Sequence, residues 1–243
     1  MCNKHVPVRK GSDMHVPDGF LDAPTSVATA AVAVAGVGLA LSRARRELDD
    51  RTAPLAGLVA VFVFAAQMLN FPVGAGTSGH LLGGTLAAVL VGPWTATLCL
   101  TVVLAVQALL FADGGITALG TNITLMALVG VWAGWLVFVG LRRVARSAGP
   151  KVVPALAGVA ALVSVPTAAL AFTALYAVGG RAPIPLGELT AAMVGWHTVI
   201  GIGEGVITLL AVGSIIATRP DLVHGARGLL SARPLQIRTE VPA

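Results

Sequence analysis

Charged residues are scarce in this chain, and Asp, Glu, Lys and Arg together make up only 11% of its 243 residues. A soluble domain carries roughly 25% charged residues, so the composition excludes an ordinary soluble protein. Hydrophobic residues make up 56% of the chain, and the mean hydropathy is +0.87. These values predict a polytopic membrane protein, in which each helical crossing needs ~20 apolar residues.

Cysteine and the commonest hydrolase motifs are also missing or nearly so. Cys2 lies near the chain start and Cys99 inside an apolar run, so we expect neither a disulfide nor a cysteine-based metal cluster. The sequence has no GxxxxGK[ST] motif, which excludes ATP hydrolysis by a P-loop. It has no HExxH motif and no Gly-Ser nucleophile elbow either. An ATP-driven role would therefore require a separate ATPase.

Seven apolar spans are predicted, at residues 24–42, 54–70, 80–93, 94–112, 118–141, 152–178 and 191–217. The third span is too short to cross a ~30 Å hydrocarbon core at ~1.5 Å per residue. Its glycines Gly83 and Gly84 favour close packing against other helices. The predicted fold class is an all-α polytopic membrane protein of about seven transmembrane helices, with one short buried helix after a Gly-rich external loop.

Basic residues lie mostly on one side of these spans. If the N-terminus is external, the cytoplasmic segments hold twelve of the sixteen basic residues: Arg43, Arg45, Arg46, Arg51, Arg142, Arg143, Arg146, Lys151, Arg219, Arg227, Arg233 and Arg238. The external segments after Met14 hold only Arg181. Because positive charge collects on the cytoplasmic side, the pattern predicts N-out, C-in orientation.

The chain start conflicts with this orientation. Residues 1–13 carry Lys4, Arg9 and Lys10, and they lack the apolar core and cleavage site of a signal peptide. A chain that begins at Met14 removes the conflict. We therefore divide the sequence into a leader at 1–13 that is not expected in the mature chain, a membrane domain at 14–218 and a cytoplasmic tail at 219–243.

Met14 and His15 are candidate metal ligands. If Met14 is the first residue, its α-amine, the backbone nitrogen of His15 and the His15 imidazole close adjacent chelate rings around one divalent ion. This leaves a fourth position open, and a tetragonal nitrogen site suits Ni(II) or Cu(II). The alternative is an ordinary dipeptide before a Pro-Asp-Gly turn.

His80 is a candidate for the fourth position, because it ends the Gly-rich external segment 70–79 and neutral imidazole is a good nickel ligand. The alternative is a helix-start histidine whose ring is satisfied by local carbonyl groups. Ser78, Asn122 and His197 are candidates for the shell behind the ligands.

Glu204 lies two helical turns after His197, on the same helix face. A carboxylate in mid-membrane costs ~2.5–3.5 kcal/mol on insertion scales, and such residues are usually paired and functional. Glu204 belongs either to a hydrogen-bond network, with Gln107 or Asn122 as partners, or to an ion path. A hypothesis from another class is an intramembrane enzyme that uses His197 and Glu204 as acid and base.

Five motifs resemble the cobalt/nickel permeases of energy-coupling-factor transporters, known as the CbiM/NikM family. They are MHVPDGFL (14–21), GTSGHLLGG (76–84), QALLFADGG (107–115), GTN (120–122) and HTVIGIGE (197–204). The fourth motif, Gly-Thr-Asn, departs mildly from the Gly-Ala-Asn that is usual in the family. The resemblance implies a metal held by the Met14 amine, the His15 amide and imidazole, and His80.

The resemblance also implies a function and partners. The chain would be the substrate-capture subunit of an importer of Ni(II) or Co(II), with no enzymatic activity of its own, in the cell membrane of a prokaryote. A transmembrane coupling protein, paired cytosolic ATPases and a small accessory membrane subunit are the implied partners. The planar nitrogen site favours Ni(II). The alternatives are cobalt import for cobalamin synthesis and a sensor subunit that binds metal without passing it.

Overall fold

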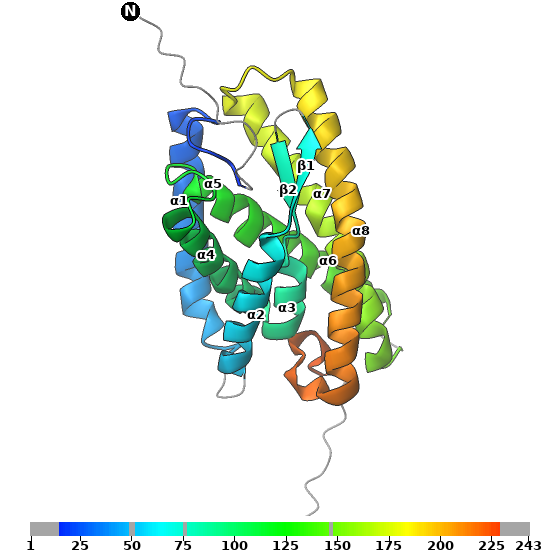
Figure 1. Cartoon of the computed structure of the whole chain (residues 1–243). Coiled ribbons are helices and arrows are strands. Elements are labelled where there is room, and N and C mark those ends of the chain that lie inside the picture. The colour runs from blue at the N-terminus through cyan, green and yellow to red at the C-terminus, as the bar shows by residue number, and fades with distance from the viewer. Residues whose placement is uncertain (1–14, 49–51, 75–76, 146–147, 229–243) are drawn as a thin grey trace, which may run out of the picture.

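The computed structural model describes residues 15–48, 52–74, 77–145 and 148–228. Its helices are α1 (Ala23–Ala44), α2 (Thr52–Gln67), α3 (Gly84–Val91), α4 (Pro93–Leu110), α5 (Leu119–Asn122), α6 (Val131–Val144), α7 (Val153–Gly179) and α8 (Leu186–Thr218). A π-helical segment, Ile123–Gly130, joins α5 to α6, so residues 119–144 form one continuous helical run. The helices stand as a bundle, with α7 and α8 side by side along its edge (Figure 1).

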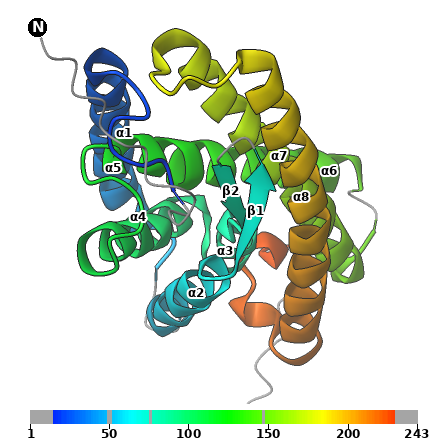
Figure 2. The same cartoon turned by 45° about the horizontal axis from the view of Figure 1, so that its top comes forward.

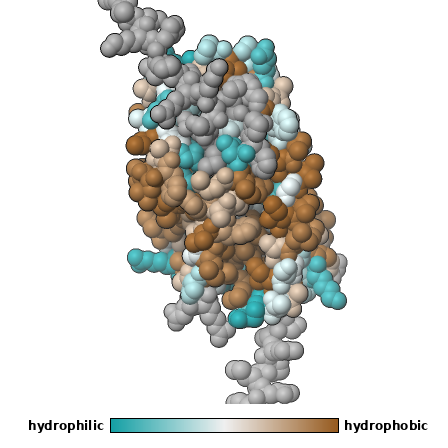
Figure 3. All heavy atoms as spheres, viewed as in Figure 1, coloured by the Kyte–Doolittle hydropathy of each residue, from teal (hydrophilic) through white to brown (hydrophobic). Residues whose placement is uncertain are grey.

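The seven predicted helical spans are confirmed, with corrected ends. Five helical runs are long and apolar enough to cross a membrane: α1, α4, 119–144, 150–179 and α8. The shorter α2 has 16 residues, and the last helix begins at Leu186 rather than at residue 191. Apolar side chains cover the middle of the molecule and hydrophilic ones gather toward its two ends, which is the pattern a bilayer requires (Figure 3).

The Gly-rich segment was predicted as a loop, and this was wrong. It forms an antiparallel hairpin of β1 (Asn70–Gly74) and β2 (Thr77–His80). Seen from its own end of the bundle, the hairpin lies in the middle of the surrounding helices (Figure 2). A hairpin pairs its backbone groups within itself, so it is tolerated where water is scarce and an open loop is not.

The short helix α3 follows the hairpin, and all eight of its residues are buried. The prediction of a short buried helix is therefore confirmed, although it begins at Gly84 and not at residue 80. Gly83 precedes it with φ +73°, and a Cβ there would lie 2.8 Å from the side chain of Val63. Only glycine fits this left-handed position without strain.

The opposite end of the bundle is closed by the first part of the tail. Two 3₁₀ turns, Pro220–Leu222 and His224–Ala226, fold back toward α3, and Ala226 is fully buried. Arg142 Nη1 donates a hydrogen bond to the Gly225 carbonyl at 2.8 Å. Residues 219–228 therefore pack on the bundle as an extension of the membrane domain. The remainder of the predicted tail lies outside the described residues.

The carboxylate of Glu47 stabilises the same end of the bundle. Glu47, just after α1, accepts hydrogen bonds from the Trp94 and Thr95 backbone amides at 3.3 and 2.7 Å. It thereby caps the start of α4, because the N-cap residue Gly92 has no side chain that could accept from these amides. Gly92 allows this approach, since a Cβ there would lie 2.4 Å from the Glu47 carboxyl carbon.

Glycines set the distance between α7 and α8. A Cβ on Gly205 would lie 2.9 Å from the Gly158 carbonyl oxygen, and one on Gly158 would lie 2.8 Å from the Gly205 carbonyl oxygen. Two residues earlier on the same helix, Gly203 has open space around it. The close approach of α7 and α8 thus depends on one face of each helix.

We expect Gly205→Ala to destabilise the protein by about 1–3 kcal/mol, because the methyl group would force two packed backbones apart. Gly203→Ala is the matched control and should be neutral or slightly stabilising, since alanine favours helix. Thermal unfolding of the two variants in the same detergent measures the difference. Equal melting temperatures for both would contradict the role assigned to this contact.

Candidate metal centre

Two histidines far apart in the sequence meet beside the hairpin. The His15 ring, from the segment before α1, and the His80 ring, at the end of β2, have centroids 4.7 Å apart and planes at 87°. Both residues are buried. The sequence placed these residues in one site, and the structure brings their rings into edge-to-face contact. Met14, the third predicted ligand residue, lies outside the described residues.

The His15 ring has a defined proton position. Its Nε2 lies 2.9 Å from Gln107 Oε1 on α4 and 3.6 Å from Asp113 Oδ2. Because both oxygens are acceptors, Nε2 carries the proton and donates it to Gln107. The lone pair is then on Nδ1, which is buried without a hydrogen-bond partner among the described residues. An orphaned buried acceptor of this kind is the chemical state of a metal-ligating imidazole.

The proton of the His80 ring is fixed in the same way. His80 Nδ1 lies 2.9 Å from the Leu81 carbonyl oxygen. A carbonyl can only accept, so Nδ1 carries the proton and Nε2 carries the lone pair. The local carbonyl of Leu81 thus accounts for Nδ1, and His80 ends a strand rather than starting a helix.

Burial holds both imidazoles neutral. It lowers the pKa of His15 to about 4, although the hydrogen bond to Gln107 acts in the opposite direction. It lowers the pKa of His80 to about 3, and repulsion from His15 adds to the effect. At neutral pH each ring therefore offers a lone pair without first losing a proton.

The segment that carries His15 is attached to the bundle by its backbone. Val16 N–H donates to Asn122 Oδ1 at 3.0 Å, and Asn122 Nδ2 donates to the Val16 carbonyl at 3.2 Å. The Gly115 amide donates to the same carbonyl at 3.0 Å. Asn122 was a candidate for the shell behind the ligands, and the structure places it against the residue that follows His15.

Glycines of the FADGG segment make room for this approach. Gly114 has φ +84°, and a Cβ there would lie 2.8 Å from His15 Cβ. A Cβ on Gly115 would lie 2.3 Å from the Asp18 amide nitrogen. The segment that carries His15 is also bonded to the end of α7, where the Asp22 N–H donates a hydrogen bond to the Gly179 carbonyl at 2.7 Å.

His197 lies against the back of the hairpin. Its Nδ1 donates to the Met193 carbonyl at 2.7 Å, and its Cε1 lies 3.4 Å from where a Cβ on Gly79 would stand. It is close enough to His80 to influence its charge. Ser78, the remaining candidate, lies on β2 two residues before His80 and is partly buried.

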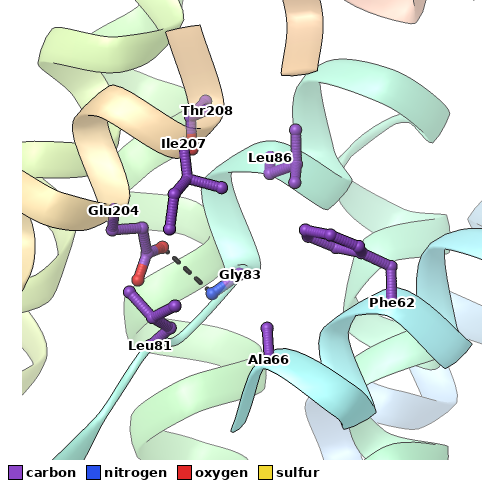
Figure 4. Close-up of a pocket in the computed structure, with 8 residues that line it drawn as sticks. All are labelled: Phe62, Ala66, Leu81, Gly83, Leu86, Glu204, Ile207 and Thr208. Carbon is purple, nitrogen blue, oxygen red and sulfur yellow. Dashed lines mark hydrogen bonds between the residues drawn. The ribbon is translucent and has the colours of Figure 1, made fainter. Parts of the chain in front are cut away.

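The partners expected for Glu204 were wrong. Gln107 contacts His15 and Asn122 contacts Val16, whereas the buried Glu204 carboxylate accepts hydrogen bonds from the Leu82 amide at 2.6 Å and the Gly83 amide at 3.0 Å. Figure 4 shows Glu204 reaching from α8 to the backbone at the start of α3. Periodicity can place a carboxylate on a helix face, but it carries no information about which backbone amides face it.

Gln107 is the residue of the site whose role the sequence missed. It opens the QALLFADGG motif, seven residues before Gly114, so the motif itself was the available signal. Within the described part of the chain, no three His, Cys, Asp or Glu side chains form a group able to hold a metal. A metal at the two imidazoles would therefore need further donors from the backbone, as an N-terminal chelate supplies.

Known proteins similar to this chain are metal transporters. The family described as "Cobalt uptake substrate-specific transmembrane region" matches residues 15–222. The fused nickel transport protein NikMN of Rhodobacter capsulatus is 35% identical over 88% of this chain, which spans 65% of that protein. The cobalt transport protein CbiM of Sorangium cellulosum is 35% identical over 86% of this chain and 94% of that protein. The crystal structure of a transition metal transporter superposes with a TM-score of 0.77 at 30% identity, and the match covers 84% of this chain and 93% of that one.

We expect Asn122→Leu to loosen the segment around His15, because the Val16 N–H and C=O would both lose a side-chain partner. The cost should be about 1–3 kcal/mol and should speed hydrogen exchange of the Val16 amide accordingly. Thr124→Val is the control, since Thr124 Oγ1 donates to Thr29 O on α1 and does not contact Val16. Unchanged Val16 exchange in folded Asn122→Leu would contradict the attachment described above.

Proposed function

Because this chain belongs to the CbiM/NikM family of substrate-binding membrane components of energy-coupling-factor transporters for transition metals, we propose that it captures Ni(II) outside the cell for import. It is a multi-pass membrane protein of a prokaryotic transport family. The family consists of transport proteins, which excludes the intramembrane enzyme built on His197 and Glu204. The observation that carries the proposal is the contact between two buried imidazoles, of which His15 Nδ1 has no hydrogen-bond partner among the described residues.

Four nitrogen atoms make up the proposed ligand set. They are the α-amine of Met14 as the chain's first residue, the His15 amide, His15 Nδ1 and His80 Nε2. The free lone pair on His15 Nδ1 supports the chelate, because Nδ1 is the ring nitrogen nearest to the residue's own backbone. The tautomer of His80 supports its Nε2 as the fourth ligand, because the ring proton is on Nδ1. Gln107 and the Leu81 carbonyl hold the two rings in these tautomers.

Nickel is favoured over cobalt by the chemistry of this donor set. Nitrogen ligands in a tetragonal arrangement suit Ni(II), and Ni(II) stands above Co(II) in the Irving–Williams order. Relatives are named for both metals, so cobalt import for cobalamin synthesis is the alternative. The ratio of Ni(II) to Co(II) affinity measured on one protein preparation distinguishes them.

The proposed orientation puts the hairpin end outside and the tail end in the cytoplasm. The described basic residues at the tail end include Arg142, Arg143, Lys151 and Arg219, and the loop at the hairpin end carries Arg181. This distribution follows the positive-inside rule. The site then opens toward the side from which an imported ion arrives.

The proposed partners supply the energy that this chain lacks. A transmembrane coupling protein, a pair of cytosolic ATPases and a small accessory membrane subunit complete the transporter. The fused NikMN relative, which this chain spans only in part, supports the accessory subunit.

A chain that begins at Met14 should bind Ni(II), and His80→Ala in that chain should bind it far more weakly. Loss of a ligand should exceed the roughly tenfold to hundredfold cost of losing a ligand's outer partner. Retention of residues 1–13 should weaken binding as well, because the Met14 nitrogen becomes an internal amide. Isothermal titration calorimetry on purified protein measures all three affinities.

His224→Ala serves as the control for the loss of a half-buried histidine, since His224 lies at the tail end of the bundle. It should bind Ni(II) like the parent chain. Normal binding by His80→Ala together with lost binding by His197→Ala would move the site deeper than proposed. Ni(II) binding without uptake by cells that also hold the partner proteins would favour the sensor alternative.

The orientation is tested by labelling single cysteines in a chain that begins at Met14, and so lacks Cys2, and whose Cys99 is replaced by alanine. A membrane-impermeant maleimide added to intact cells should label a cysteine at Arg181 and should not label one at Lys151. Both should react after the cells are permeabilised. The reverse pattern in intact cells would overturn the N-out orientation and the proposed direction of transport.

A further inference from the structure

Two consecutive peptide groups after His80 are held by side chains at both of their polar atoms. The peptide between Leu81 and Leu82 accepts from His80 Nδ1 through its C=O and donates to Glu204 through its N–H. The peptide between Leu82 and Gly83 accepts from Gln67 Nε2 at 2.9 Å and donates to the other Glu204 oxygen. Glu204, Gln67 and His80 are all buried.

We propose that Glu204 is a positioning residue for the metal ligand His80, acting through the single peptide group that lies between them. The carboxylate on α8 fixes the Leu82 N–H, the planar peptide transmits that orientation to the Leu81 C=O, and the C=O fixes the proton of His80 on Nδ1. This inference rests on the proposed function, because it takes His80 Nε2 as the metal ligand.

The geometry of the peptide bond makes this transmission direct. The C=O and N–H of one peptide lie in a plane with a barrier of ~18–20 kcal/mol against rotation, so fixing one end fixes the other. Hydrogen bonds in a chain also polarise one another, and a carboxylate at the end of the chain strengthens the acceptor at the start. Metal-ligating histidines commonly donate their other N–H to a carboxylate or a carbonyl, and here the two are joined in series.

The surroundings leave the peptide little freedom to adopt another orientation. Gly83 stands at φ +73° against Val63, and Gln67 holds the Leu82 carbonyl. Glu204 lies at one side of a small pocket whose other lining residues are mostly apolar and include Phe62, Leu86 and Ile207 (Figure 4). A displaced Leu82 N–H would lose its carboxylate acceptor, and an unpaired buried N–H is costly, so the Glu204 contact favours the observed orientation of the peptide.

Glu47 provides a matched control within the same chain. It too is a buried carboxylate that accepts from two consecutive backbone amides at the start of a helix, those of Trp94 and Thr95. It lies between α1 and α4 at the tail end of the bundle, with no peptide shared with His80. A purely structural role for buried carboxylates predicts the same consequences for Glu47→Gln and Glu204→Gln.

The first test needs no metal. In protein labelled with ¹⁵N-histidine, His80 should be in the Nδ1–H tautomer, with its signals assigned by their loss in His80→Ala. In Glu204→Gln the amide side chain keeps one acceptor only, and the Nε2–H tautomer of His80 should become populated. Glu47→Gln should leave the His80 signals unchanged.

The second test uses Ni(II) and the chain that begins at Met14. Glu204→Gln should weaken Ni(II) binding by about tenfold to a hundredfold. Its ligand-field absorption should shift toward that of His80→Ala. Glu47→Gln should keep the parent affinity and spectrum, even where its melting temperature falls. Should Glu204→Gln not be recovered folded, Glu204→Asp takes its place, because the shorter carboxylate cannot reach both amides.

The outcomes separate this inference from the proposed function. If the His80 tautomer changes in Glu204→Gln but the parent chain binds no Ni(II), the metal site is overturned and the effect of Glu204 on the His80 ring is supported. A parent chain that binds Ni(II), with folded Glu204 variants that keep the parent tautomer, affinity and spectrum, overturns the positioning role alone. Equal effects of the Glu47 and Glu204 variants would also overturn it.

Discussion

Irregular backbone inside a membrane protein needs a protein partner for every buried N–H and C=O group, and the site of this chain depends on that requirement. Two segments leave regular structure near the imidazoles, one around Val16 and one from Leu81 to Gly83. Side chains from distant helices supply the missing partners, Asn122 for the first segment, and Gln67 and Glu204 for the second. The candidate ligands are therefore positioned by buried polar residues, and each of these residues is hydrogen-bonded, as burial of a polar group requires.

Burial and backbone hydrogen bonding act on different groups of this site. Burial removes the positive charge from His15 and His80, which leaves two lone pairs available for a cation. Each oxygen of the Glu204 carboxyl group instead accepts a hydrogen bond from a backbone N–H, that of Leu82 or that of Gly83. The candidate site therefore combines two buried imidazoles with a carboxyl group that is held by backbone amides of the segment after His80.

The two ends of the bundle use the same device for different purposes. Glu47 and Glu204 each cap a helix by accepting from two consecutive amides, but only Glu204 caps the helix that follows a ligand-bearing strand. The tail end is closed by Arg142 and the 3₁₀ turns after α8. The hairpin end is closed by the segment that carries His15. The segment that holds a candidate ligand therefore also covers this end of the bundle.

The sequence by itself determined the membrane class, the seven helical spans, the short buried helix and the meeting of His15 with His80. Hydrophobic runs and small-residue patterns predict the helices, because the thickness and apolar interior of a bilayer set the length and composition of each spanning helix. The pairing of the two histidines came from motifs whose order matches a family. Without these motifs, the residue types alone were also compatible with an ordinary dipeptide at Met14-His15 and a helix-start histidine at His80.

Tertiary structure alone decided the hairpin, the tautomers of the imidazoles and the partner of Glu204. Segment 70–79 carries too many glycines for strand propensity to predict β1 and β2. Gln107 was expected near Glu204 and instead fixes the His15 proton. Side-chain-to-backbone contacts between residues more than a hundred positions apart leave no periodic trace in a sequence, so only the folded arrangement could pair Glu204 with the Leu82 amide.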